Sequence, residues 1–277
     1  MARHLPAVGD WVAIEPIVHG RTTIRGIFPR RTEVRRVAAG NHKKRLGGRR
    51  LQTLAANVDR LVIVLALDRD WSAGTVERYL ALAIASGAEP LVVLNKNDLC
   101  TAVAARVNEV QKIAGRASVL SVSGATRNGI DKLLAFAKAG QSWALIGPSG
   151  SGKSTLLNGL AGIDLQRTGR ISLTLGKGRH TTTERELRLL ASGLIVIDNP
   201  GLRELQIDDA AQFVGSLFGD LEILGQHCRF RDCRHAAEPG CAIRAALAVG
   251  DLDPDRTARY LQWRQEPAGV PSAPGRA

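Results

Sequence analysis

The sequence predicts an α/β protein: a parallel sheet, with a small basic β-barrel before it and a mostly helical, metal-binding region after it. Three observations carry this prediction. Apolar strands alternate with helical segments from residue 58 onward, a glycine-rich turn joins one strand to a helix, and three cysteines and a histidine gather near the C-terminus. Apolar strands separated by helices are typical of a parallel sheet covered on both faces. We expect domains at 1–57, 58–220 and 221–265, with a disordered tail at 266–277.

The first 57 residues have the pattern of short β segments with a strong positive charge. Segments at 8–16, 22–29 and 32–38 are separated by turn residues, which favours a small barrel. Twelve lysines and arginines stand here against three acidic residues, so this stretch carries +9 of the formal net charge of +12. Such an excess favours a polyanion such as nucleic acid, with a basic surface that only serves solubility as the alternative.

The following region supplies strands at 61–67, 90–95, 117–123 and 142–146, with helices expected at 75–86, 103–113 and 130–137. Ligands of such sheets bind at the carboxyl ends of the strands. No apolar run approaches the ~18 residues of a membrane span, and the first residues lack the apolar core of a secretory signal. We therefore expect a cytoplasmic protein with no membrane partner.

A phosphate-binding loop follows the strand at 142–146. Glycines let the backbone turn and point several N–H groups at phosphate oxygens, and the next helix adds its positive end. Lys153 is expected at the β- and γ-phosphates and Ser154 at Mg²⁺. A turn that binds nothing is the alternative. The nucleotide-contacting residues predicted here are Gly147, Pro148, Ser149, Gly150, Ser151, Gly152, Lys153, Ser154 and Thr155.

A guanine-reading element follows the strand at 90–95. The Asp98 carboxylate would accept hydrogen bonds from the guanine N1–H and amino group, which adenine does not offer, and the wrong base would leave a buried carboxylate unpaired. Alone, the tetrapeptide could be a polar turn, but beside a phosphate loop it indicates GTP and GDP. Ser123, in the segment 121–125, is expected to support the base. The element consists of Asn95, Lys96, Asn97 and Asp98.

Two further segments match γ-phosphate-sensing switches. Residues 178–183 supply hydroxyls, of which Thr182 is expected to bind Mg²⁺ and the γ-phosphate. Residues 193–201 form an apolar strand that ends in Asp-x-x-Gly. Asp198 would hold Mg²⁺ through a water, and the Gly201 N–H would meet the γ-phosphate. A plain βα turn is the alternative for the second segment.

The order of these elements indicates a circular permutation. GTPases usually run from the phosphate loop through Asp-x-x-Gly to the guanine-reading element, whereas here the guanine-reading element comes first. Permutation is compatible with one closed fold because domain termini tend to lie close together at the surface. The region after Gly201 is therefore connected directly to a γ-phosphate sensor.

A zinc site is predicted in that region. Its spacing, C-x4-C-x-H-x5-C, offers three thiolates and one imidazole, which suit a closed structural Zn²⁺ site. Free buried cysteines are the alternative, and His227 is an alternative ligand that would duplicate its neighbour. The predicted ligands are Cys228, Cys233, His235 and Cys241.

With these segments assembled, the sequence resembles the circularly permuted GTPases of small-subunit biogenesis, the RsgA/YjeQ family. The motifs are VGDW, AANVD (55–59), NKND, GPSGSGKST, GRHTTT, DNPGLRE and the Cys/His cluster. The resemblance implies an OB-fold barrel, a permuted GTPase domain and a zinc domain that contact 16S rRNA, with GTP hydrolysis stimulated by the small (30S) subunit. Few residues precede VGDW, so we expect either a truncated start or an abbreviated barrel. We also expect a monomer.

Hydrolysis is expected to be slow without a partner. Leu202 follows the Asp-x-x-Gly segment where Ras-like enzymes carry the glutamine that orients water, so we expect turnover well under ~1 s⁻¹. His180 is the candidate substitute, and a structural role in its loop is the alternative. Two rival functions remain: an RNA-binding checkpoint scaffold that senses GTP with incidental turnover, and a translation-factor-like GTPase acting on whole ribosomes.

Overall fold

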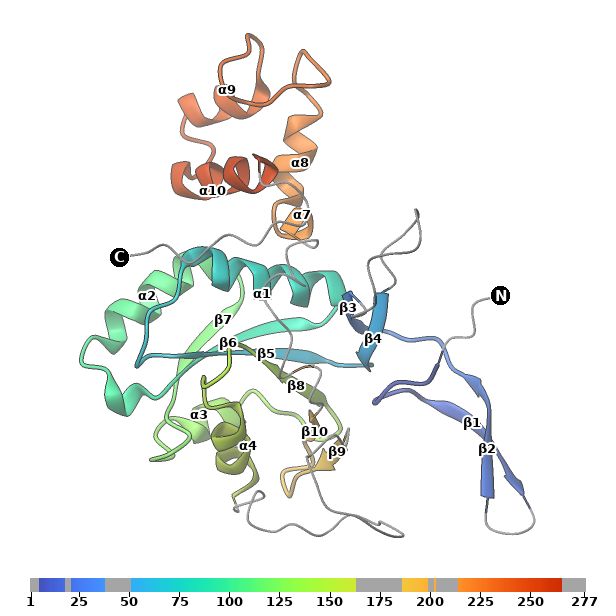
Figure 1. The fold of residues 1–277 in the computed structure, drawn as a ribbon. Helices are drawn as coiled ribbons and strands as arrows, with labels where there is room; N and C mark the ends of the chain where they lie inside the picture. The colour runs from blue at the N-terminus through green and yellow to red at the C-terminus, as the bar shows by residue number, and fades with distance from the viewer. Residues whose placement is uncertain are drawn as a thin grey trace, which may run out of the picture.

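The computed structural model describes residues 5–17, 21–37, 51–162, 186–198, 202 and 214–265. Figure 1 shows two hairpin-like β segments at the N-terminus, a central sheet between helices, and a helical module at the C-terminus. These are the parts that the sequence predicts, in the predicted order. In the described part of the chain, no helix is both long and apolar enough to cross a bilayer.

The central sheet has six strands in the order β7-β6-β5-β8-β10-β9. Neighbouring strands from β7 to β10 pair in parallel, and β9 pairs antiparallel with β10 at one edge. Parallel pairing brings the carboxyl ends of β5, β6, β7, β8 and β10 to one edge of the sheet, so residues distant in sequence meet there. Sequence reasoning missed β9. The bounds are β5 Arg60–Ala66, β6 Glu89–Asn95, β7 Ser118–Ser121, β8 Ser142–Ile146, β9 Glu186–Leu189 and β10 Ile195–Asp198.

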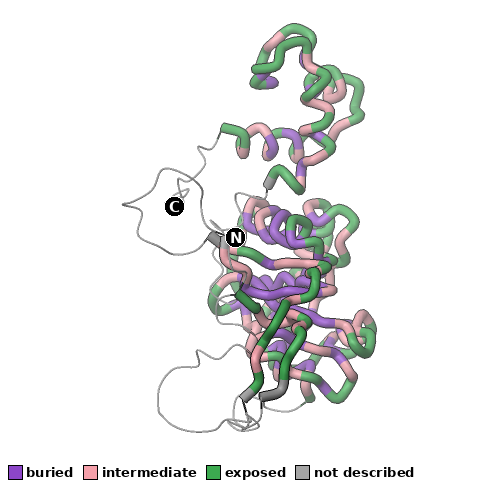
Figure 2. The backbone as a smooth tube through the Cα atoms, turned by 90° about the vertical axis from the view of Figure 1, so that its right-hand side faces the viewer, coloured by how far each residue is buried: buried purple, intermediate pink, exposed green. Residues whose placement is uncertain are grey.

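Helices cover both faces of this sheet, as the fully buried strands β5 and β8 require. Helices α1 (Ala73–Ser86) and α2 (Val103–Ala114) lie on one face, and α3 (Ile130–Leu134) and α4 (Lys153–Ala161) lie on the other (Figure 1). Each face has its own apolar cluster, the first including Val76 and Tyr79 and the second Trp143 and Leu156. Figure 2 shows this buried core in purple along the middle of the tube. Helix α3 is shorter than the predicted 130–137.

The N-terminal segments form two separate two-stranded antiparallel sheets, β1 (Val12–Ile17) with β2 (Arg21–Ile27) and β3 (Glu33–Val37) with β4 (Leu51–Ala56). A parallel bridge between Val8 and Ala55 ties the first residues to β4. Within residues 5–17, 21–37 and 51–56 the strands do not close into a full barrel. In these residues the predicted barrel is represented by the two separate two-stranded sheets. The basic loop at 39–50 lies outside the described residues.

The AANVD segment joins these strands to the sheet through Asn57. Its backbone has a positive φ of 53°, which asparagine tolerates better than most residues. Its side chain accepts from the Arg31 N–H at 2.9 Å and donates to the Gly9 carbonyl at 2.9 Å. Ser142 at the start of β8 donates through its N–H to Asp59 at 2.8 Å. The β segments are therefore fixed to the first residues of β5 and β8.

The C-terminal module consists of α7 (Val214–Leu217), α8 (Gly219–Gly225), α9 (Ala242–Ala248) and α10 (Pro254–Gln265). Its core contains Phe218, Tyr260 and two of the predicted metal ligands, and Ala81 of α1 belongs to the same cluster. The module therefore packs on α1 (Figure 1). The proposed tail at 266–277 lies outside the described residues.

Candidate nucleotide site and metal centre

The glycine-rich loop that is predicted to bind phosphate connects β8 to α4. Gly147 has φ 140°, and a Cβ there would lie 2.1 Å from the Val64 carbonyl oxygen, so only glycine fits between β8 and β5. Gly150 and Gly152 also have positive φ, at 75° and 86°. Lys153 bends back over the loop, and its ammonium donates to the Gly147 and Pro148 carbonyls at 2.7 and 2.8 Å. The lysine side chain therefore lies over the loop that precedes it.

Asn95, the last residue of β6, links the guanine-reading element to the phosphate loop. Its side chain is 2% exposed. The amide Nδ2 donates to the Ser151 carbonyl at 2.9 Å, and Oδ1 accepts from the Gly124 N–H at 2.9 Å. One buried amide thus joins the three loops that the sequence predicts around the nucleotide.

The next residues of this element turn away from the sheet. Lys96 has a left-handed backbone with φ 64°, and Asn97–Leu99 form a short 3₁₀ helix. The Lys96 ammonium pairs with Asp68 at 2.6 Å. Asp98 is exposed, so its carboxylate is accessible to a base.

The supporting base loop follows β7. Ser123 is fully buried and its hydroxyl accepts from the Thr126 N–H at 3.0 Å. Gly124 lies against the first turn of α4, where a Cβ would be 2.9 Å from the Leu156 nitrogen. The absence of a side chain at Gly124 lets the base loop pack directly on the helix that starts at Lys153.

Asp198 ends β10 at the same edge of the sheet. It lines a small hollow together with Lys153 and the apolar side chains beneath them. Ser154 and Thr155 follow Lys153 in the first turn of α4, half-buried and exposed respectively. Ser154 and Asp198 carry the oxygen ligands that Mg²⁺ prefers.

Three predicted site residues, His180, Thr182 and Gly201, lie outside the described residues. Leu202 is described and is 1% exposed within the core that includes α1. Its apolar side chain therefore packs in the interior.

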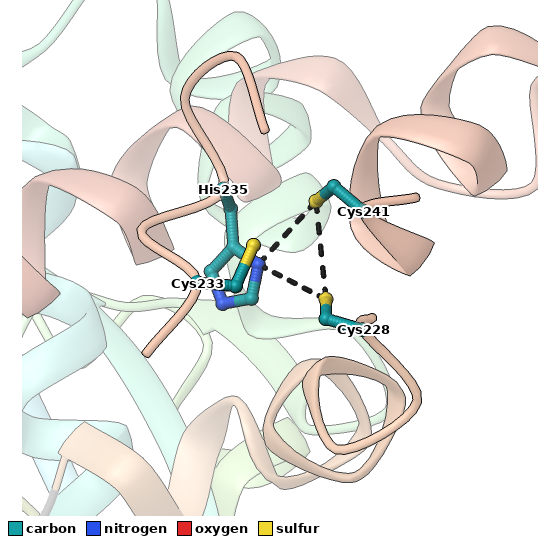
Figure 3. Close-up of side chains that lie close together, drawn as sticks. All are labelled: Cys228, Cys233, His235 and Cys241. Carbon is teal, nitrogen blue, oxygen red and sulfur yellow. Dashed lines mark hydrogen bonds between the residues drawn. The ribbon is translucent and has the colours of Figure 1, made fainter. Parts of the chain in front are cut away.

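The four predicted metal ligands come together in the C-terminal module (Figure 3). The ligand atoms of Cys228, Cys233, His235 and Cys241 all lie within 4.8 Å of one another. The Cys228 and Cys241 sulfurs are 3.9 Å apart, and His235 Nδ1 lies 3.5 and 3.4 Å from them. A tetrahedral Zn²⁺ with its usual bond lengths separates its ligands by about 3.8 Å between sulfurs and about 3.6 Å from sulfur to nitrogen. The residues therefore fit a zinc ion.

The surroundings favour the form of His235 that binds metal. Burial and the nearby Arg264 guanidinium lower the pKa of His235, so its ring is neutral at pH 7. The ring is 3% exposed, and Arg264 approaches its other nitrogen, Nε2, at 3.0 Å. His227 instead approaches the Ile223 carbonyl at 3.1 Å, and it is not part of the cluster.

Sequence reasoning missed the loop Leu67–Ser72, which lies at the same edge as the nucleotide elements. Asp68 pairs with Lys96, and Arg69 donates to the Ser149 carbonyl at 3.2 Å. One signal was available: the charged residues directly follow the apolar strand β5, whose carboxyl end is where ligands of such sheets bind.

Comparison with known proteins agrees with this geometry. The family described as RsgA GTPase matches residues 27–208. A protein of Syntrophotalea carbinolica named small ribosomal subunit biogenesis GTPase RsgA is 47% identical over 268 residues, covering 96% of this chain and 74% of the relative. The protein of the same name in Opitutus terrae is 46% identical over 276 residues, covering 95% of this chain and 73% of the relative.

Two solved structures share the fold. The crystal structure of YjeQ from Thermotoga maritima superposes with a TM-score of 0.65 at 26% identity, covering 94% of this chain and 84% of that chain. YloQ, described as a circularly permuted GTPase, has a TM-score of 0.59 at 22% identity, covering 95% of this chain and 80% of that chain. The permuted order inferred from the sequence is therefore found in a protein of the same fold.

Proposed function

This chain belongs to the RsgA GTPase family, and we propose that it hydrolyses GTP to GDP and phosphate during late maturation of the small ribosomal subunit, stimulated by that subunit. One observation carries the proposal: Asn95 hydrogen-bonds both the phosphate-binding loop and the base loop, so all three nucleotide elements meet at one edge of the sheet. The names of the relatives support the small subunit as the partner.

The residues would act by positioning and charge neutralisation, which phosphoryl transfer needs more than covalent chemistry. Lys153, which lies over the loop carbonyls, would contact the β- and γ-phosphates. Ser154, Thr182 and Asp198 would hold Mg²⁺, which neutralises phosphate charge when bound. The Gly201 N–H would contact the γ-phosphate.

Guanine selection would rest on Asp98, with Asn95 and Ser123 holding the surrounding loops. The other phosphate-loop residues would line the phosphates, and all of them except Pro148, which has no backbone N–H, would offer that group to phosphate oxygens. His180 would take the place of the missing glutamine and orient the attacking water, because Leu202 is buried in the core.

We expect domains at 1–57, 58–220 and 221–265. The first and the last of these would contact RNA, with 16S rRNA as the ligand. Exposed Trp11 and Phe28 lie on adjacent segments, joined by a hydrogen bond of 2.9 Å from the Phe28 N–H to the Trp11 carbonyl, and such rings stack on unpaired bases. The metal-binding loop adds exposed arginines at 229, 231 and 234. We expect the protein to act as a cytoplasmic monomer.

The test is steady-state hydrolysis of GTP and of ATP, with and without isolated small subunits. We expect a slow GTP-specific rate that rises severalfold or more with the subunits. Asp98→Asn should lose GTP selectivity. A His180→Ala variant that binds the subunit without leaving it supports the switch enzyme, whereas unchanged release favours a scaffold with incidental turnover. A GTP hydrolysis rate that is the same with and without small subunits contradicts the proposal.

A further inference from the structure

The loop Leu67–Ser72, between β5 and α1, borders the nucleotide elements. Leu67 anchors it, since its N–H donates to the Asn95 carbonyl at 2.9 Å. The next residues, Asp68 and Arg69, are therefore held beside the end of β6.

Asp68 holds the lysine of the guanine-reading element. Its Oδ2 lies 2.6 Å from the Lys96 ammonium, and both side chains are 25% exposed. The hydrogen bond from Lys96 lowers the pKa of Asp68, so the carboxylate stays ionised. The lysine stem passes the phosphate loop on the way, because its Cε lies 3.8 Å from the position of a Cβ on Gly152. The far end of the Lys96 side chain therefore lies between Asp68 and the phosphate loop.

Arg69 extends this contact to the phosphate loop. Its Nε lies 3.4 Å from Asp68 Oδ1, and its Nη1 donates to the Ser149 carbonyl at 3.2 Å. The guanidinium lies against Gly150, where a Cβ would be 3.0 Å from Nη1. The chain Lys96–Asp68–Arg69 thus joins the guanine-reading element to the phosphate loop along a second route besides Asn95.

We propose that Asp68 is a positioning residue for guanine nucleotides, which holds the Lys96 side chain across the phosphate loop before the nucleotide arrives. The inference rests on the proposed function. A lysine side chain loses much rotamer freedom when it is immobilised, and a ligand that meets it already placed avoids that cost. Asp68 would therefore strengthen binding without touching the nucleotide.

The test measures affinity and dissociation of a fluorescent GDP (mant-GDP) for the full chain carrying Asp68→Asn. We expect the Kd to rise about five- to tenfold, mainly through faster dissociation, as a pre-organising contact predicts. The matched control is Asp70→Asn in the same loop. The Asp70 side chain is fully exposed and meets Arg106 only at 3.5 Å. The Kd of the Asp70→Asn variant for mant-GDP should therefore stay within about twofold of the wild-type value.

A double-mutant cycle tests whether Asp68 acts through Lys96. Lys96→Met keeps the apolar stem and removes the ammonium, so Asp68→Asn should have no further effect in that background. An unchanged Kd for Asp68→Asn, or an equal loss with and without Lys96, overturns the inference. A wild-type chain that fails to bind mant-GDP would instead contradict the proposed function, and the inference with it.

Discussion

Asn95→Ala should destabilise the protein even without nucleotide, because the Asn95 amide joins three loops of the protein itself. The side chain is 2% exposed and makes two hydrogen bonds of 2.9 Å, one to the Ser151 carbonyl and one from the Gly124 N–H. Both partners are buried. Alanine would leave a buried acceptor and a buried donor without these bonds.

The expected loss follows from those two groups. Each buried polar group left unsatisfied costs about 1–3 kcal/mol, which gives about 2–6 kcal/mol for the pair. Domain stability totals roughly 5–15 kcal/mol, so the loss is a large fraction of it. The neighbouring Asn97 provides a matched control, since its buried Oδ1 has no hydrogen-bond partner among the described residues. Asn97→Ala should cost less than about 1 kcal/mol.

The measurement is urea unfolding of the nucleotide-free protein followed by circular dichroism, with linear extrapolation to water. The prediction is refuted if the free energy of unfolding of Asn95→Ala lies within about 0.5 kcal/mol of the wild-type value, which is the range of ordinary surface substitutions. It is also refuted if the two asparagine variants lose equal stability, because then the bridge between the loops contributes nothing beyond a generic truncation.

Removal of the metal by a chelator should unfold residues 214–265 before the sheet, because structural zinc binding is coupled to folding. Amide hydrogen exchange should rise first in residues 214–265, and an equal rise throughout the protein would contradict this. Burial raises the pKa of Glu33, but hydrogen bonds such as that from Arg35 lower it to about 2 from 4.5. The stability that Glu33 contributes is therefore complete above about pH 4.5 and lost as the pH falls toward 2. In the Glu33→Gln variant, the urea midpoint should depend less on pH over that range than in the wild type. An equal pH dependence in the two proteins would count against the pKa shift. Arg259→Met should cost about 3–5 kcal/mol in urea unfolding, because it leaves Glu77, 2% exposed, as a buried unpaired carboxylate. Adding Glu77→Gln should restore most of the lost free energy of unfolding. A double variant no more stable than Arg259→Met would refute this.

Local sequence determined much of the nucleotide site. The phosphate loop is predictable because Gly147 must admit the Val64 carbonyl and Gly152 must adopt a positive φ, and both constraints appear as glycines at fixed spacing. The zinc ligands are predictable for a similar reason, since the spacing from Cys228 to Cys241 matches one compact loop. In both places the chemistry lies within a short stretch of chain.

Contacts between distant residues could not be predicted in the same way. Asp68 and Lys96 are 28 residues apart, and neither position identifies its partner without the strand order. Glu77 has the composition of an exposed helix residue, yet its carboxylate is buried against Arg259, 182 residues later. Burial of such a charge depends on which helix packs there, and only the tertiary arrangement supplies that information.

Helix α1 connects the two predicted binding centres. It begins at the loop that holds Lys96, where Ser72 caps its first turn by accepting from the Thr75 N–H at 3.2 Å. Its next turn contacts the zinc module, because Glu77 pairs with Arg259 and the neighbouring arginine stacks on the Trp263 ring at 4.3 Å. One helix therefore joins the loop to residues that hold the module. If this packing couples the sites, Arg259→Met should also change mant-GDP affinity; unchanged affinity would leave α1 a rigid support.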